Sequence, residues 1–177
     1  GNDLKGIGLY IDSIVENVCT CRFEGTDISG FDVGVRVGDA NPKKPDGTPG
    51  KTDTNWFWFS YIRLCNTCIE EQSFHIDCNS YFVNVEACAP DSVAIRTGAS
   101  FGKWHVILGT GDWFYDRVDR KDNKTKSIIF DPGAQHNVME IFPPVEYFAP
   151  TVDNSGNDTN VIITSKRAPL NLRSREQ

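Results

Sequence analysis

Apolar and polar residues alternate over short stretches in much of the chain, which is the pattern of β-strands that bury one face. The clearest example is FDVGVRV at 31–37. In the second half, strands are predicted at 92–97, 103–108, 113–118, 127–130, 138–142 and 161–165. The turns between them are short and glycine-rich or charged, with a hairpin loop at 109–112. The pattern therefore predicts an antiparallel β-sandwich or barrel.

The first half gives a more mixed pattern. Apolar residues recur at helical spacing over 3–18, which predicts an N-terminal helix that Asn2 or Asp3 could cap. The run WFWFSYIRL at 56–64 predicts a strand buried on both faces. Residues 74–87 predict a hairpin that turns at Asn79 and Ser80. Its shared apolar face would comprise Phe74, Ile76, Cys78, Tyr81, Val83 and Val85.

Cysteines divide the chain, because all six precede residue 89. We expect a cysteine-rich N-terminal domain over 1–90, a cysteine-free β-sandwich or barrel domain over 91–165, and a basic, flexible tail over 166–177. A chain of 177 residues is long enough either for one domain or for two small ones.

The cysteines also indicate the compartment. They are Cys19, Cys21, Cys65, Cys68, Cys78 and Cys88. A zinc site is disfavoured because C-T-C does not match the usual C-x-x-C partner and two cysteines are left over. A thioredoxin-type site is disfavoured because no helix pattern follows C-N-T-C. The even count and the glycosylation sequons at Asn123 and Asn157 favour three disulfides in a secreted chain, with the pairing open.

Charge and motifs exclude several functions. The net charge of −6 and a pI near 5.0 disfavour binding to nucleic acid or to anionic membranes. The segment 46–52 imitates a phosphate-binding loop, but Pro45 replaces the first glycine. The segment 130–136 is similar to the second metal motif of cupins, and His75, His105 and His136 could converge on a metal. No catalytic constellation and no cofactor are predicted.

Binding is instead expected at loops, which a rigid scaffold can present to a partner. The loops are 39–55, 109–112, 119–126 and 151–160. The candidate binding residues in or beside these loops are Lys43, Lys44, Lys51, Trp113, Phe114, Lys121 and Lys124.

The order of a helix, C-T-C, a strand-rich segment with C-N-T-C, two more cysteines and a cysteine-free β-rich half resembles the dual-domain (FOLD) secreted effectors of Fusarium wilt fungi. The resemblance implies a disulfide-stapled domain, a C-terminal β-sandwich or barrel, and secretion after removal of a leader. It also implies a virulence role without catalysis in the host apoplast or xylem, with possible later entry into host cells. The expected chain is a monomer, and its expected partner is a host plant protein or immune receptor.

Two alternatives stay open. A cupin-like, metal-dependent jelly-roll enzyme would hold its metal with His105 and His136. A carbohydrate-binding β-sandwich would depend on exposed tryptophans.

Overall fold

The computed structural model describes residues 4–13, 16–39, 44–48, 50–72, 78–86, 92–109, 126–142, 152–154 and 159–164. These residues form strands and connecting turns without a helix, which confirms that the protein is mainly β. In this part of the chain there is consequently no helix that could cross a membrane. Predictions for 113–118, the hairpin loop at 109–112 beyond Gly109, and the tail at 166–177 lie outside these ranges.

Two six-stranded sheets are built from strands that the chain contributes in turn. One sheet has the order β1, β4, β7, β9, β11, β13, and the other has the order β14, β12, β10, β8, β6, β3. We call them the first and second sheets. The first comprises β1 (Ile7–Ile11), β4 (Val33–Val37), β7 (Thr67–Glu71), β9 (Val93–Thr97), β11 (Lys126–Phe130) and β13 (Val152–Asn154). The second comprises β3 (Arg22–Ser29), β6 (Trp56–Arg63), β8 (Ser80–Glu86), β10 (Lys103–Gly109), β12 (Val138–Phe142) and β14 (Val161–Thr164).

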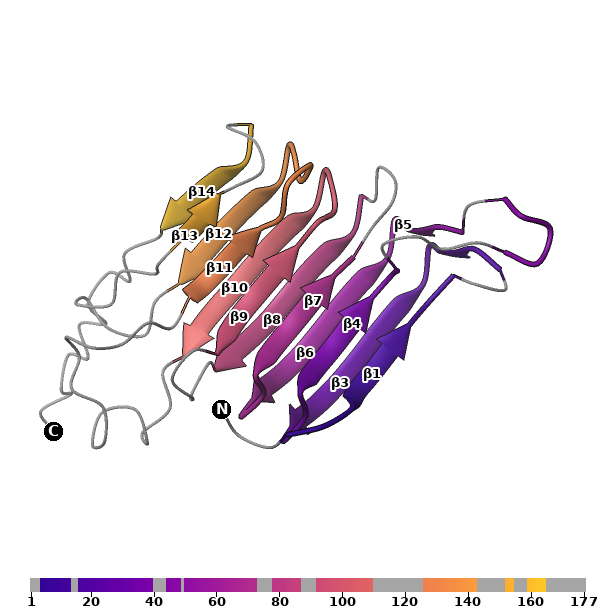
Figure 1. Ribbon diagram of the computed structural model, residues 1–177. Helices are drawn as coiled ribbons and strands as arrows, with labels where there is room; N and C mark the ends of the chain where they lie inside the picture. The colour runs from indigo at the N-terminus through magenta and orange to yellow at the C-terminus, as the bar shows by residue number, and fades with distance from the viewer. Residues whose placement is uncertain are drawn as a thin grey trace, which may run out of the picture.

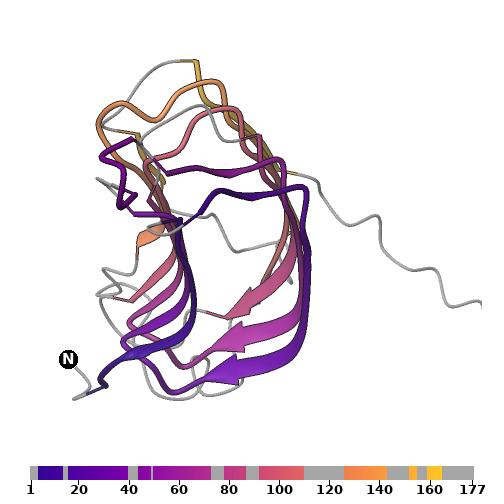
Figure 2. The same ribbon diagram turned by 90° about the vertical axis from the view of Figure 1, so that its right-hand side faces the viewer.

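Each coil of chain therefore places one strand in each sheet before it advances to the next coil. All described strand pairs are parallel, including the small pair of β2 (Val18–Cys19) and β5 (Thr52–Asp53). This arrangement is a parallel β-helix, in which coils stack along one axis (Figure 1). In the turned view, the two sheets stand as facing walls (Figure 2).

The predicted antiparallel sandwich is wrong, although most of its predicted strands are present. Alternation identifies a strand and its buried face, but it does not identify the strand's partners. Both edges of β8 are occupied, by β6 and β10, so an antiparallel hairpin partner from 74–78 has no place beside it. The same holds for β10, which lies between β8 and β12 and cannot pair with a hairpin partner at 113–118.

The predicted N-terminal helix is also wrong, because β1 occupies the middle of its range. Ile7, Leu9 and Ile11 alternate with more exposed residues and pair with β4. Gly8 allows close packing here, since a Cβ atom at this position would come within 2.7 Å of the Gly34 carbonyl oxygen. The apolar residues of 3–18 fit both the helical and the strand period, and pairing with β4 favours the strand.

Both sheets continue across residue 90, the expected boundary between two domains. In the first sheet β7 pairs with β9, and in the second β8 pairs with β10. Strands from the two expected domains therefore share both sheets.

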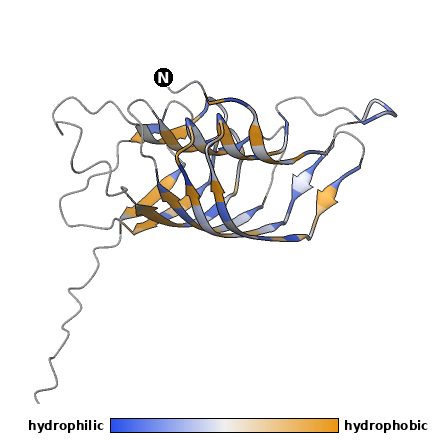
Figure 3. Cartoon of the chain, turned by 90° about the horizontal axis from the view of Figure 1, so that it is seen from below, coloured by the Kyte–Doolittle hydropathy of each residue, from blue (hydrophilic) through white to orange (hydrophobic). Residues whose placement is uncertain are grey.

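The core consists of rows of residues that occupy the same position in successive coils. In the second sheet, Phe23, Phe57, Tyr81 and Trp104 form an inward row, with neighbouring ring centroids 5.1, 4.7 and 3.7 Å apart. Phe57, Tyr81 and Trp104 are almost fully buried. Stacked pairs of this kind contribute about 1 kcal/mol beyond the burial of their area. Figure 3 shows the resulting alternation of hydrophobic and hydrophilic residues along the strands.

Asparagines connect the coils at the entry to the second sheet. The Asn55 side-chain oxygen accepts from the Cys21 amide at 2.9 Å, and the Asn79 oxygen accepts from the Asn55 amide at 2.9 Å. Further along, the Asn137 oxygen accepts from the Gly102 amide at 2.9 Å, and the Asn160 oxygen accepts from the Asn137 amide at 3.1 Å. Each asparagine thus satisfies a backbone donor of the preceding coil.

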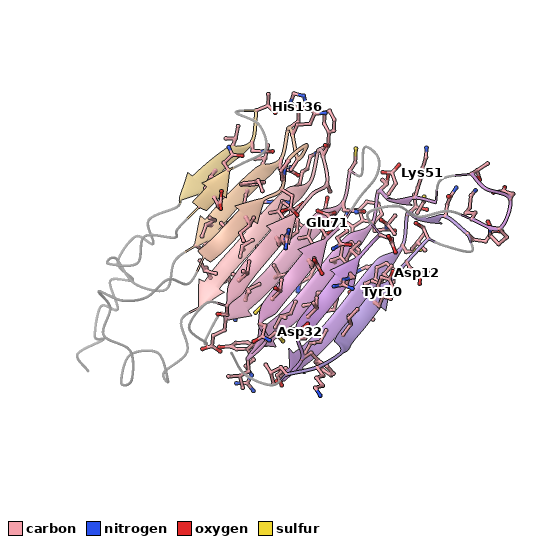
Figure 4. All side chains as sticks on the ribbon, in the orientation of Figure 1. Tyr10, Asp12, Asp32, Lys51, Glu71 and His136 are labelled. Atoms are coloured by element: carbon pink, nitrogen blue, oxygen red, sulfur yellow. The ribbon has the colours of Figure 1, made fainter. Side chains whose placement is uncertain are left out.

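A carboxyl group lies inside this core. Glu71 is almost fully buried, and Figure 4 shows it amid the strands. Its Oε1 accepts from the Tyr81 hydroxyl at 2.5 Å and from the Asn79 amide at 3.0 Å, while its Oε2 accepts from the Thr97 hydroxyl at 3.0 Å. Burial raises the pKa of Glu71 above its usual value, and the three hydrogen bonds oppose that rise.

Substitution of Asn137 by alanine should lower the free energy of unfolding by about 3 kcal/mol, because it leaves the buried Gly102 amide and Ala99 carbonyl without their partner. Urea titration measures this loss. Asn66→Ala is the matched control: Asn66 donates to Asp32 at an exposed position, so its loss should cost under about 0.5 kcal/mol. Equal losses would contradict the role of the buried asparagines.

Stability should depend on pH through Glu71. Its folded-state pKa is raised, so its contribution is complete below the unfolded value of about 4.3 and is lost as pH rises through the folded value. Glu71→Gln should therefore flatten the fall of the unfolding free energy on the alkaline side of that value. Denaturant titrations at pH values below and above the unfolded-state pKa test this prediction, with the exposed Glu24→Gln as the control. Parallel curves for wild type and Glu71→Gln would refute the assignment.

Candidate functional site: an axial groove on the second sheet

The outer face of the second sheet carries a second row of rings. Trp58, Phe82 and His105 occupy matching positions of β6, β8 and β10. The ring centroids are 5.5 Å apart for Trp58 and Phe82 and 4.8 Å apart for Phe82 and His105, and both pairs are stacked. We call these three residues the aromatic ladder.

Charged groups lie at both ends of the ladder. The Arg22 guanidinium lies 5.8 Å from the Trp58 ring centroid and forms an ion pair with Glu24 at 2.5 Å. At the other end, His105 Nδ1 lies 3.1 Å from Glu140 Oε2. The faces of the Phe82 ring are covered by its two neighbours, so the ladder turns ring edges toward solvent.

A groove of about 570 Å³ runs beside the ladder. It crosses β6, β8, β10 and β12, and we call it the axial groove. Its lining residues are Trp58, Phe59, Ser60, Phe82, Val83, Asn84, His105, Ile107 and Phe142. The register of β6 against β8 shifts between Phe59 and Ile62, which places a β-bulge at the groove.

Large apolar side chains are exposed along this face. The exposed fraction is 53% for Trp58, 37% for Phe82 and 41% for Ile107. The prediction that 56–64 is buried on both faces is therefore wrong, since Trp56 and Trp58 point outward. Because β6 carries aromatic residues on both faces, its sequence lacks the regular alternation of polar and apolar residues that normally marks the outer face of a strand. An apolar face of this kind usually marks a binding surface.

The groove combines apolar walls with hydrogen-bonding groups. The Ser60 hydroxyl and the Asn84 amide lie among the aromatic and aliphatic side chains, with the His105 imidazole beside them. His105 is the only ionisable group among these described lining residues. Such a surface suits a ligand that has both apolar edges and many uncharged donors and acceptors.

The two predicted loop residues that the structure describes, Lys44 and Lys51, do not line the axial groove. Lys44 is half-buried. Lys51 is exposed and lies beside the small β2–β5 pair, as Figure 4 shows, with its carbonyl oxygen accepting from the Val18 amide. Lys43, Trp113, Phe114, Lys121 and Lys124 lie outside the described residues, so their roles stay predictions.

The structure places the described cysteines in two regions, since the Cys78 amide donates to Asp53 of β5, which pairs with Cys19. Cys65 and Cys68 are buried at the corner between β6 and β7, whereas Cys19 and Cys21 lie near β2. Cys78 is exposed, so the prediction that it points into a core is wrong. That prediction assumed a hairpin partner for β8, whereas β6 and β10 occupy both of its edges. No disulfide joins any of these five cysteines, and Cys88 lies outside the described residues. The three-disulfide framework stays a prediction.

The described histidines do not converge. His105 belongs to the aromatic ladder, whereas His136 lies in a turn before β12 with its ring centroid 4.8 Å from that of Phe101. Within the described ranges, no three residues among His, Cys, Asp and Glu are placed to share a metal ion. His75 lies outside those ranges.

Sequence reasoning missed Ser60, Phe82 and Asn84 as a site. The available signal was that Phe82 and Asn84 share the outward face of one strand, opposite Tyr81 and Val83. Only the parallel register shows that Trp58 and His105 join them. Comparisons with protein-family models, curated proteins and solved structures return no match for this chain.

Inward and outward rings of β6 should differ in their effect on stability. Phe57→Ala should lower the free energy of unfolding by about 4 kcal/mol, because Phe57 is fully buried. Trp58→Ala should cost about 1 kcal/mol, because more than half of that side chain is exposed. Denaturant titration of the two variants measures both values, and a larger loss for Trp58→Ala would contradict the facing of β6.

Proposed function

We propose that this chain is a carbohydrate-binding protein that holds an extended, uncharged glycan in the axial groove, without catalysis. The observation that carries the proposal is the exposed ladder of Trp58, Phe82 and His105 beside the polar groups of Ser60 and Asn84. Sugars present apolar C–H surfaces and many hydroxyl groups, and this groove offers partners for both.

The repeat of the fold supports a polymeric ligand. Parallel strands lie about 4.8 Å apart, which is similar to the length of one sugar ring in an extended chain. The groove crosses four adjacent strands, so successive sugars would meet successive coils. A small compact ligand would use only part of this length.

Charge supports a neutral ligand over an anionic polymer. The chain carries a net charge of −6, which opposes binding to a polyanion. At the ladder ends, Arg22 pairs with Glu24 and His105 contacts Glu140, so each basic side chain already has an acidic neighbour. Hydrogen bonding and apolar contact would therefore supply the affinity.

The fold bears on the cupin-like enzyme expected from the sequence, but not on the effector role. A cupin-like jelly roll needs antiparallel sheets, whereas the described sheets are parallel. A role as a secreted effector that a plant immune receptor detects is a further proposal, which rests on the arrangement of the cysteines. Glycan binding would be compatible with that role, since plant surfaces are rich in polysaccharides.

An oligosaccharide array followed by calorimetry tests the proposal. We expect binding to one or more neutral oligosaccharides. Trp58→Ala and Phe82→Ala should each raise Kd at least about 10-fold, the effect of losing roughly 1.4 kcal/mol of contact. Asn84→Ala should raise Kd by a smaller factor.

Tyr10→Ala is the matched control for exposed aromatic residues. Tyr10 is 40% exposed and belongs to the first sheet, away from the axial groove, and its hydroxyl donates to Asp39. Its loss should leave Kd unchanged. Equal weakening by Tyr10→Ala and Trp58→Ala, or binding that none of the groove variants affects, would contradict this site.

A further inference from the structure

The corner between β6 and β7 contains two cysteines within one short turn. Leu64 follows β6 with a left-handed backbone (φ 53°) and reverses the direction of the chain. Cys65 comes next, and Cys68 is the second residue of β7. Two residues, Asn66 and Thr67, separate the cysteines, and the Thr67 amide donates to the Asp32 carbonyl of the preceding coil at 2.9 Å.

Both thiols lie in the core at this one corner. Cys65 and Cys68 have no exposed surface. The Cys65 thiol donates to the Arg63 carbonyl oxygen at 3.2 Å, and the Cys68 thiol donates to the Glu86 carbonyl oxygen at 3.6 Å. Gly34 of the preceding coil leaves the space for this pair, since a Cβ atom there would lie 3.1 Å from Cys65 Sγ and 2.8 Å from the Ile62 side chain. The neighbouring coil is thus shaped around the sulfur atoms.

The surroundings lower the pKa of Cys65. The neighbouring Cys68 side chain, with the backbone of Phe31 and Gly30, lowers the pKa of Cys65 to about 7, against the opposing effect of burial. A thiolate in contact with a second thiol is the arrangement that resolves a mixed disulfide.

We propose that Cys65 and Cys68 form an intramolecular disulfide that closes the β6–β7 corner when the chain meets a small-molecule disulfide such as oxidised glutathione. During an opening of the corner, the Cys65 thiolate attacks one glutathione sulfur and releases a glutathione thiolate. Cys68 then loses its proton and attacks Cys65 Sγ, which releases the second glutathione. The two cysteines lose two electrons and two protons, and one glutathione disulfide becomes two glutathione thiols.

The remaining described cysteines do not share this geometry. Cys21 and Cys78 are exposed, and the Cys21 thiol donates to the Cys19 carbonyl oxygen at 3.4 Å. The proposal concerns only the buried pair, and it is independent of glycan binding at the axial groove.

Peptide mapping tests the bridge in the wild-type chain. The folded protein is incubated with oxidised glutathione, quenched in acid, and alkylated in denaturant without reductant. Cleavage after Arg63 and Glu70 isolates LCNTCIE, which contains Cys65 and Cys68 and no other cysteine. We expect this peptide without alkylation and two hydrogens lighter than the dithiol. Subsequent reduction should restore two alkylation sites.

The same samples give a second readout. Reduction should lower Tm by about 5 °C, because the bridge restricts the unfolded chain. Cys68→Ser is the control, since its peptide should carry one glutathione or one alkyl group at Cys65. Wild-type peptide with both thiols alkylated after the oxidising incubation would overturn the proposal. Cross-linking of Cys65 or Cys68 to a peptide that contains Cys78 or Cys88 would also overturn it.

Discussion

In-register parallel pairing of successive coils is the constraint on which the rest of this structure depends. Because each strand lies directly against the matching strand of the next coil, residues at equivalent positions form rows along the axis. Neighbouring side chains within a row must then be able to pack, stack or pair with one another. Inward rows are apolar or stacked rings, the entry to the second sheet is joined by asparagines, and the row of Arg36 and Glu70 on the first sheet forms an ion pair at 2.6 Å.

The same register produces the candidate site. Phe57 and Trp58 are neighbours in sequence, and each is stacked with the corresponding ring of β8, Tyr81 inside and Phe82 outside. The inner rings are fixed by packing, and the same strand register holds the outer rings in a line. The groove is therefore a product of the stacking that stabilises the fold.

The sequence predicted strands better than their arrangement. The ranges 138–142 and 56–64 agree closely with β12 and β6, since alternation and β-branched or aromatic residues mark strands locally. Strands β3 and β7 were missed, because their glycine, threonine and charged residues obscure the alternation. Parallel pairing was missed because it depends on which strands of successive coils lie side by side, and the local pattern of apolar residues does not show this. The site was missed for the same reason, since Trp58 and His105 are brought together only by stacking.

The measurement that tests this account most directly is a nuclear Overhauser experiment on the aromatic protons. In-register parallel coils predict contacts between the rings of Trp58 and Phe82 and between those of Phe82 and His105, together with contacts between Tyr81 and Trp104 inside. Strong cross-strand Hα–Hα contacts between neighbouring strands of the second sheet, which mark antiparallel pairing, without the Phe82–His105 contact would contradict it.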